Sequence, residues 1–239
     1  LIRDGIRNEI ENNSNVNNAL QVEFLVWRIK KICDVLQHIK NLKDNLDGLE
    51  TSISLFSDCG FNLENNSNGL TVMAIMASPR KNGYTAKLLG SLLREFPKGT
   101  NFDIVNVYEL NPVPCNACGY CKAGNGCTKK DLEDFWVRFE TADIIVFATP
   151  IYFMGVPAPF KALIDRFQRY YEARFRRNMK NPIEKRRKAA LIVTSGSDGE
   201  IGYEVIKHQL LQAFSVLNIE LCGATLARNT DKCGVDSTP

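Results

Sequence analysis

The segment TVMAIMASPRKNGYTAKLLGSLLREF, residues 71–96, places an apolar run directly before a polar turn and an amphipathic stretch. Residues 71–77 have the length and apolar character of a buried strand, and residues 84–96 carry apolar side chains at helical spacing. The same succession recurs along the chain, which favours a parallel sheet covered by helices on both faces. Strands are predicted near 71–77, 102–108, 144–149, 189–194 and 219–225, and helices near 84–96, 130–140, 158–178 and 201–217.

Five such strands fit the flavodoxin-like order 2-1-3-4-5, in which ligands bind beyond the carboxyl ends of the strands. An Asn- and Ser-rich stretch, residues 62–68, precedes the first strand and marks a boundary near Gly69. We therefore predict a helical N-terminal extension at residues 1–69 and a doubly wound, flavodoxin-like α/β domain at residues 70–239. Within the extension, residues 20–48 carry an apolar helical stripe, which serves either oligomerisation or packing on its own domain.

The composition excludes several classes of protein. A formal net charge of +3 is too small to favour nucleic-acid binding. No apolar run is long enough to cross a membrane, and the Asn-rich start does not resemble a secretion signal. Eight cysteines in such a chain are typical of a reduced compartment. We expect a cytoplasmic globular protein that binds neither nucleic acid nor membrane.

The loop after the first predicted strand, residues 78–85, has the chemistry of a phosphate site. Ser78 and Thr85 offer hydroxyls, Arg80 offers a charged planar donor, and Gly83 permits close backbone approach. The helix that follows adds free N–H groups and the positive end of its dipole. The loop lacks the glycine pattern of a dinucleotide fold and the G-K-[ST] of a nucleoside triphosphatase, so we expect a mononucleotide phosphate unless the segment is an ordinary turn.

Two further strand ends supply apolar and polar loops. Residues 149–157, TPIYFMGVP, form an aromatic loop stiffened by prolines, which suits a flat heteroaromatic ring, although aromatic residues at strand ends are often core. Residues 194–199, TSGSDG, form a polar, Gly-rich loop that suits the edge of such a ring. Three strand ends together therefore predict contacts to a phosphate, a ring and a polar ring edge.

Four cysteines lie within thirteen residues at the spacing C-x2-C-x2-C-x5-C, namely Cys115, Cys118, Cys121 and Cys127. The intervening residues Asn116, Gly119, Gly124, Asn125 and Gly126 tolerate a positive φ, so a short loop can aim several thiolates inward, as an iron–sulfur cluster requires. Thr128 follows the last cysteine where two-cluster ferredoxins have proline, which favours one self-contained cluster. Structural zinc, a disulfide framework and four free cysteines are the alternatives.

A basic cluster follows the aromatic loop and is diluted by three carboxylates. It either forms a solvated helix end and loop, or attracts an acidic electron-transfer partner such as a ferredoxin, or binds the phosphates of a nicotinamide donor. The cluster comprises Arg166, Arg169, Arg174, Arg176, Arg177, Lys180, Lys185, Arg186, Arg187 and Lys188.

The stretches ASPRKNGYTAKLL, CNACGYCKAGNGCTKKDLEDF and ATPIYFMGVPAPFKALIDRF resemble the NADPH-dependent FMN reductase superfamily over about residues 70–228. The cysteine run narrows the resemblance to the iron–sulfur flavoproteins. It implies FMN, a 4Fe–4S cluster on the four cysteines, and a homo-oligomer, either a dimer or a tetramer. By position, the resemblance assigns the phosphate of FMN to Ser78, Arg80, Asn82 and Thr85. It assigns the isoalloxazine ring to Pro150, Ile151, Tyr152, Phe153, Met154 and Gly155, and the polar edge of the ring to Thr194, Ser195 and Gly196.

These features predict an FMN- and 4Fe–4S-containing electron-transfer oxidoreductase, with NAD(P)H or a ferredoxin as the electron donor. The cofactors supply the chemistry, so we nominate binding residues and no catalytic side chain. One alternative is a cluster-free NAD(P)H-dependent FMN or quinone reductase. Another is a non-enzymatic flavin-binding regulatory module that recruits a partner through its N-terminal helix.

Overall fold

The computed structural model describes residues 69–233. The predicted helix at 20–48, the rest of the N-terminal extension up to residue 68, and residues 234–239 of the predicted domain lie outside the described residues. None of the helices between residues 69 and 233 combines the length and the apolar character needed to cross a bilayer.

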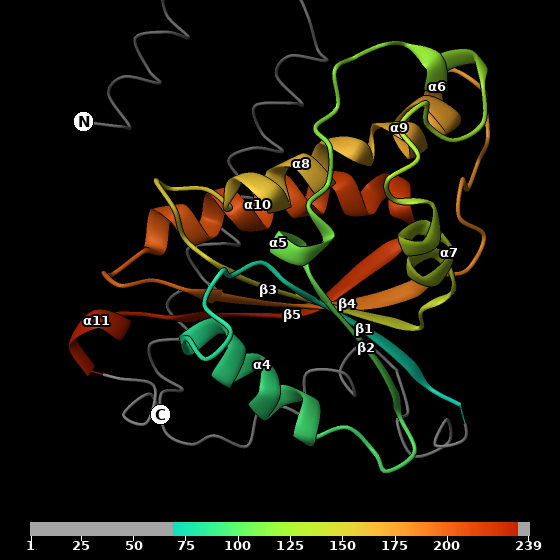
Figure 1. Cartoon of the computed structure of the whole chain (residues 1–239). Helices are drawn as coiled ribbons and strands as arrows, with labels where there is room; N and C mark the ends of the chain where they lie inside the picture. The colour runs from blue at the N-terminus through green and yellow to red at the C-terminus, as the bar shows by residue number, and fades with distance from the viewer. Residues whose placement is uncertain (1–68, 234–239) are drawn as a thin grey trace, which may run out of the picture. The chain divides into compact units, whose positions relative to one another are not determined.

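A five-stranded parallel sheet forms the centre of the described domain (Figure 1). Its order is β2-β1-β3-β4-β5, and every neighbouring pair is parallel, which confirms the predicted fold class. The strands are β1 (Thr71–Met76), β2 (Asn101–Asn106), β3 (Ile144–Pro150), β4 (Arg187–Thr194) and β5 (Ile219–Ala227).

Helices cover both faces of this sheet. In Figure 1, α4 lies below the sheet, and α5, α7, α8, α9 and α10 lie above it. The helices are α4 (Tyr84–Arg94), α5 (Val107–Leu110), α6 (Tyr120–Ala123), α7 (Glu133–Thr141), α8 (Ala158–Arg166), α9 (Gln168–Phe175), α10 (Glu200–Leu217) and α11 (Thr230–Cys233).

Two apolar layers follow from the alternation of side chains along the strands. Met73 and Ile75 of β1 belong to the larger core with residues of α7, α8 and α10. Val72 and Ala74 face the other way and pack in a smaller core with Leu89 of α4. The inner strands are therefore apolar on both faces, which explains why they are continuous hydrophobic runs in the sequence.

Two predicted elements differ from the observed ones. The strand expected at 102–108 ends at Asn106, because the side chain of Asn106 accepts a 2.9 Å hydrogen bond from the Tyr108 N–H and caps α5. The helix expected at 158–178 is broken at Phe167, whose N–H bonds back three residues to the Ile164 carbonyl at 3.0 Å. The second part, α9, ends at Phe175, and Asn178 has a left-handed φ of 57°. Local hydrogen bonds at Asn106 and Phe167 thus determine where the strand and the first helix end.

Arg187, at the amino end of β4, is completely buried instead of belonging to an exposed basic cluster. Its guanidinium donates hydrogen bonds to the Phe139 carbonyl at 2.6 Å and to the Leu217 carbonyl. These carbonyls lie in the last turns of α7 and α10, where helical carbonyls have no intrahelical partner. Burial lowers the pKa of Arg187 to about 10. This arginine therefore holds two helix ends to the sheet.

Candidate functional site

Three loops meet at the carboxyl edge of the sheet, as the sequence predicted. The Ala77 N–H donates to the Ala148 carbonyl at 2.8 Å, and the Ile151 N–H donates to the Thr194 carbonyl at 2.9 Å. The hydroxyls of Thr85 and Thr194 share a buried 2.7 Å hydrogen bond. Residues 109 positions apart in the chain thus belong to one rigid edge.

The first loop, residues 78–83, leaves two of its predicted phosphate-binding side chains exposed. Ser78 is buried and its hydroxyl accepts a 3.2 Å hydrogen bond from the Arg80 N–H, whereas the side chains of Arg80 and Asn82 are exposed. No side chain caps the N-terminus of α4, so its first-turn N–H groups lack a capping partner. A Cβ at Gly83 would lie 2.9 Å from the Cβ of Arg80, which is why a side chain does not fit this turn.

The second loop forms a tight hairpin that projects apolar side chains outward. Tyr152 and Gly155 exchange backbone hydrogen bonds of 2.8 and 2.9 Å, and the central residues Phe153 and Met154 have left-handed φ values of 47° and 63°. Such a conformation is strained for residues with a side chain. Phe153 is fully exposed, so the alternative in which these aromatic residues are core is wrong for it.

The hairpin is seated on α10 through a glycine. A Cβ at Gly202 would lie 2.8 Å from Cγ2 of Ile151 and 3.4 Å from Cα of Met154. Glycine at this position therefore lets the loop and the helix approach closely. Any side chain there would displace the hairpin.

The third loop, residues 194–199, is covered from one side by α11. Thr194 and Ser195 are buried, and the Ser195 carbonyl accepts hydrogen bonds from the Thr230 N–H at 3.0 Å and the Thr230 hydroxyl at 3.1 Å. A Cβ at Gly196 would lie 2.2 Å from Oδ2 of Asp231. The segment that follows β5 thus places the carboxylate of Asp231 beside the loop predicted to contact the polar ring edge. The sequence prediction did not include this residue.

Tyr108 of α5 is a further side chain near this edge that the sequence did not indicate. Burial, followed by the charge of the neighbouring Tyr152, raises its pKa. The sequence prediction missed it because residue 108 was placed in a strand. The turn signal of Asn106 is the feature that reveals it.

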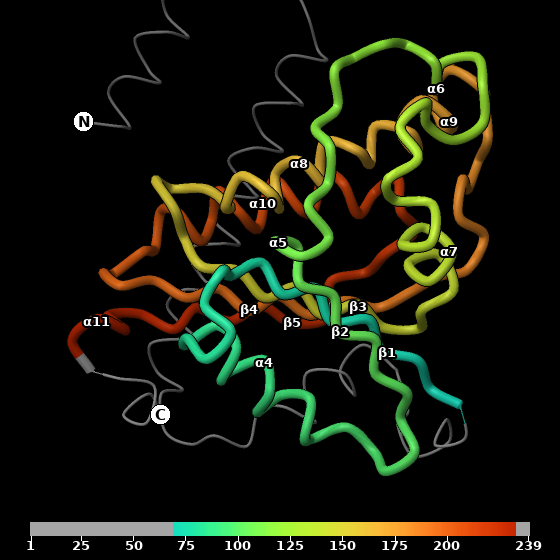
Figure 2. The backbone as a smooth tube through the Cα atoms, in the orientation of Figure 1, coloured from blue at the N-terminus to red at the C-terminus, as the bar shows by residue number. Residues whose placement is uncertain are grey.

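The cysteine loop leaves the sheet at α5 and returns at α7 (Figure 2). Gly119 and Gly126 have positive φ values of 77° and 87°, as predicted. Ala117 also has a positive φ, 52°, which the sequence did not predict. Gly124 instead is extended, with φ of −97°, and makes room for the ring of Tyr120, since a Cβ there would lie 2.8 Å from its Cζ. The short helix α6 places Cys121 within the loop.

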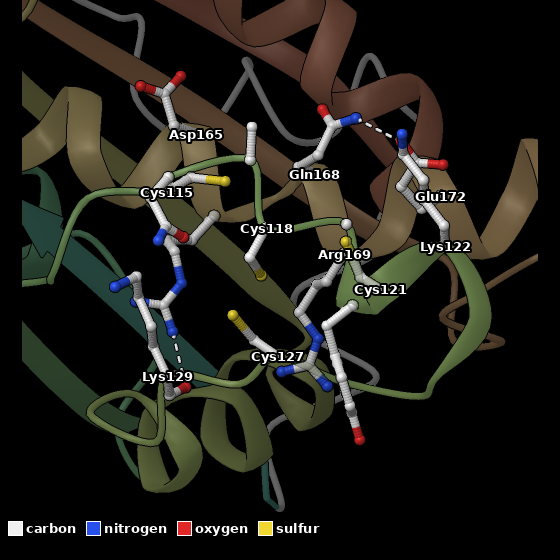
Figure 3. Close-up of a pocket in the computed structure, with 15 residues that line it drawn as sticks. Cys115, Cys118, Cys121, Lys122, Cys127, Lys129, Asp165, Gln168, Arg169 and Glu172 are labelled. Carbon is white, nitrogen blue, oxygen red and sulfur yellow. Dashed lines mark hydrogen bonds between the residues drawn. The ribbon is translucent and has the colours of Figure 1, made fainter.

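All four cysteines line one cavity of about 370 Å³ between this loop and helices α8 and α9 (Figure 3). None of the four takes part in a disulfide. Among residues 69–233, no group of three or more Cys, His, Asp or Glu side chains has the spacing needed to hold a metal ion, so the cluster stays a prediction. The charged residues that line the cavity are Lys122, Lys129, Asp165, Arg166, Arg169 and Glu172.

Arg166 closes the base of the cysteine loop. Its side chain is 1% exposed and donates to the Val113 carbonyl at 2.8 Å, to Oδ1 of Asp131 at 2.9 Å and to the Lys129 carbonyl at 3.0 Å. Asp131 also accepts the Val113 N–H at 2.8 Å. Burial works to raise the pKa of Asp131, but this N–H and the Arg166 guanidinium together lower it. One buried arginine thus joins the two stems of the loop.

The cysteines differ in their electrostatic surroundings. The hydroxyl of Thr128, 3.5 Å from the Cys118 sulfur, and the Tyr120 N–H lower the pKa of Cys118. Burial, and then the charge of Glu172, raises the pKa of Cys121. Cys118 is therefore the thiol of this pair that forms a thiolate more readily, and thiolates are the form that binds metals.

Comparisons with known proteins identify the family and the fold. The family model described as NADPH-dependent FMN reductase matches residues 70–231. The structure of Smu.1420 from Streptococcus mutans UA159 has a TM-score of 0.53 and 17% sequence identity, and the match covers 70% of this chain and 92% of that chain. At this identity the likeness concerns the fold alone.

Two curated archaeal proteins, each named "Iron-sulfur flavoprotein", are similar in sequence. The protein of Methanosarcina thermophila is 34% identical over 100 residues, which are 41% of this chain and 52% of that protein. A protein of Archaeoglobus fulgidus is 32% identical over 103 residues, 42% of this chain and 47% of that protein. The chain therefore spans about half the length of the curated relatives it matches.

Proposed function

The chain belongs to the NADPH-dependent FMN reductase family, and from this premise we propose that it is a flavin-dependent oxidoreductase that passes electrons between FMN and a 4Fe–4S cluster. The observation that carries the proposal is the presence of two sites in one domain. One is the set of strand-end loops bonded together at Thr85, Ile151 and Thr194. The other is the cavity lined by four cysteines.

The charge and polarity of the strand-end loops support FMN as their ligand. The uncapped N-terminus of α4, the exposed Arg80 and the hydroxyl-lined turn form a site for a phosphate dianion. The apolar hairpin suits the isoalloxazine ring, and the buried Thr194 and Ser195 suit its polar edge. The proposed FMN residues are Ser78, Arg80, Asn82, Gly83, Thr85, Pro150, Ile151, Tyr152, Phe153, Met154, Gly155, Thr194, Ser195 and Gly196.

The cysteine cavity fits a cluster that carries negative charge. Cys115, Cys118, Cys121 and Cys127 supply four thiols from one loop, and four cationic side chains and two carboxylates line the same cavity. The guanidinium of Arg169 has a buried Nη1 without a hydrogen-bond partner, which is a donor still to be satisfied. Thiolate ligands and nearby donors are what Fe–S clusters require.

The residues of the chain hold and tune the cofactors; they do not act as nucleophiles. When bound, FMN would supply two-electron chemistry and a cluster one-electron chemistry, so a chain that holds both would connect the two kinds of electron carrier. The rigid edge around Thr85 and Thr194 orients the flavin. The apolar hairpin excludes water from the ring, and the Arg166 clamp holds the cysteine loop in place.

The finer properties of this function are also proposals. The family name favours NADPH as the donor, and NADH and a ferredoxin are the alternatives. Assembly into a dimer or tetramer would bring cofactors of neighbouring subunits together. Residues 70–239 would form the FMN-binding domain with the cysteine loop, residues 115–127, inserted. Residues 1–69 would form the helical extension of a cytoplasmic protein.

The test is to purify the full chain without oxygen and measure FMN, iron and acid-labile sulfide per chain. We expect bound FMN with about four irons and about four sulfides per chain. Cys118→Ala should lose the iron and sulfide and keep FMN. Cys222→Ala is the matched control, because Cys222 lies in β5 and does not line the cavity.

Other outcomes would contradict the proposal in different ways. FMN without iron in the unmodified chain would identify a cluster-free NAD(P)H-dependent FMN or quinone reductase. Flavin binding without any reductase activity, together with loss of a partner on removal of residues 1–69, would identify a regulatory module.

A further inference from the structure

Of the two arginines that line the cysteine cavity, Arg169 of α9 has the less fully compensated charge. Its nearest carboxylate, Glu140, lies 3.9 Å from Nη2, beyond hydrogen-bond distance. Glu140 instead accepts a 2.6 Å hydrogen bond from the Tyr170 hydroxyl. Nη1 of Arg169 is buried and unpaired. The guanidinium therefore keeps both charge and an N–H group for a further partner.

Packing holds this guanidinium at the cysteine loop. Its central carbon lies 5.1 Å from the ring centroids of both Trp136 and Tyr170. A Cβ at Gly126, the residue before Cys127, would lie 3.8 Å from Nη2. Figure 3 shows Arg169 on the cavity side of α9, with the labelled cysteines around the same space. The two aromatic rings thus fix a cation next to the loop backbone.

The other cations of the cavity are Arg166, whose donors are engaged, the partly exposed Lys129 and the exposed Lys122. The Arg166 guanidinium donates to Asp131 and to two carbonyls. Lys122 is an exposed side chain of α6. A buried cation with an unpaired donor affects a neighbouring charge more strongly than a solvated lysine does, because water screens the latter.

We propose that Arg169 sets the reduction potential of the cluster, an inference that rests on the proposed function. Reduction adds one electron, and so one negative charge, to a centre whose four thiolate ligands are already negative. A fixed guanidinium stabilises the form with more negative charge and raises the potential, since hydrogen bonds to sulfur and net charge are main determinants of Fe–S potentials. Arg169 thereby makes the cluster a better acceptor of the flavin's electrons.

The experiment is a potentiometric titration of the cluster-containing full chain with dithionite and mediator dyes. The cluster is followed by electron paramagnetic resonance and FMN by absorbance. Arg169→Met, which removes the charge and keeps an apolar stem, should reduce the equilibrium constant for cluster reduction about tenfold, a shift of about 59 mV to more negative potential for one electron. The FMN potential should stay unchanged, and Arg169→Lys should restore most of the cluster potential.

Arg174→Met is the matched control. Arg174 lies on the same helix, bonds the Ser215 carbonyl and does not line the cavity, so its removal should leave both potentials unchanged. If Arg169→Met does not retain iron, Arg169→Gln, which keeps amide donors without the charge, is titrated in its place. An unchanged cluster potential in a variant with full iron content overturns the inference, and so does loss of iron from both variants. Absence of iron from the unmodified chain instead overturns the proposed function.

Discussion

Replacing Arg166 by methionine should release the cysteine loop from the domain. The side chain is 1% exposed and makes hydrogen bonds to Asp131, Val113 and Lys129, on both stems of the loop. Removing one partner of a buried ion pair costs about 3–5 kcal/mol. Asp131 keeps 23% of its side chain exposed, so water rehydrates the released carboxylate in part. We therefore expect the low end of that range, about 3 kcal/mol.

The free energy of unfolding is measured by urea titration of the purified full chain, followed by far-ultraviolet circular dichroism. For a chain of this size each kcal/mol corresponds to roughly 2–4 °C in the melting temperature, so Arg166→Met should melt roughly 6–12 °C lower. Iron per chain after dialysis is the second measurement. It should fall, because the stems that position Cys115 and Cys127 are no longer joined.

Lys161→Met is the control for this prediction. Lys161 forms a 2.6 Å ion pair with Asp165 on the same helix, α8, but both side chains are more than 40% exposed. Its removal should change the free energy of unfolding by less than about 0.5 kcal/mol. If Arg166→Met destabilises the chain no more than Lys161→Met and retains its iron, the clamp does not hold the loop.

Three further predictions concern the two sites. Although burial opposes it, the Val113 N–H and the Arg166 guanidinium hold the pKa of Asp131 below its usual value in the folded chain. The unfolded chain therefore binds more protons, and stability falls, as the pH drops below about 4. Asp131→Asn should make this fall shallower in acid-unfolding curves. Gly202→Ala should displace the hairpin and raise the Kd for FMN roughly tenfold, which is equivalent to about 1.4 kcal/mol of strain and is measured by fluorescence titration. Gly90→Ala is the control and should leave the Kd unchanged, because a Cβ there meets only Arg94 at 3.8 Å. The double change Phe153→Asn and Met154→Gly places residues that favour left-handed φ values at both central positions of the hairpin turn. It should therefore raise the free energy of unfolding by about 1 kcal/mol and weaken FMN binding. Equal or tighter FMN binding would contradict the role of the apolar hairpin.

The sheet order and the strand-end loops could be predicted because they depend on repeated, local patterns. Buried parallel strands such as 71–76 and 144–150 are apolar on both faces, and each is followed by turn residues and a helical period. The boundaries were less predictable. The side chain of Asn106 converts the end of a strand into the cap of α5, and the tightened turn at Phe167 divides one apolar helix into two.

The tertiary roles of arginine could not be predicted from charge patterning. In the sequence, Arg166, Arg169 and Arg187 belong to one basic run. In the structure, Arg166 is bonded to residues 35 and 53 positions away, and Arg187 to a carbonyl 48 positions away. Such contacts depend on which helix ends and loop stems meet in space, and no local spacing encodes them.

Helix α8 connects the two proposed cofactor sites along the chain. It begins directly after the hairpin loop at Ala158 and ends at Arg166, which clamps the cysteine loop. Nine helical residues rise about 13 Å, so the hairpin and the clamp are held at opposite ends of a short rigid rod. Phe160, Leu163 and Ile164 bury this rod in the larger core. The packed helix has no break before Phe167, so it fixes the spacing between the hairpin and the clamp.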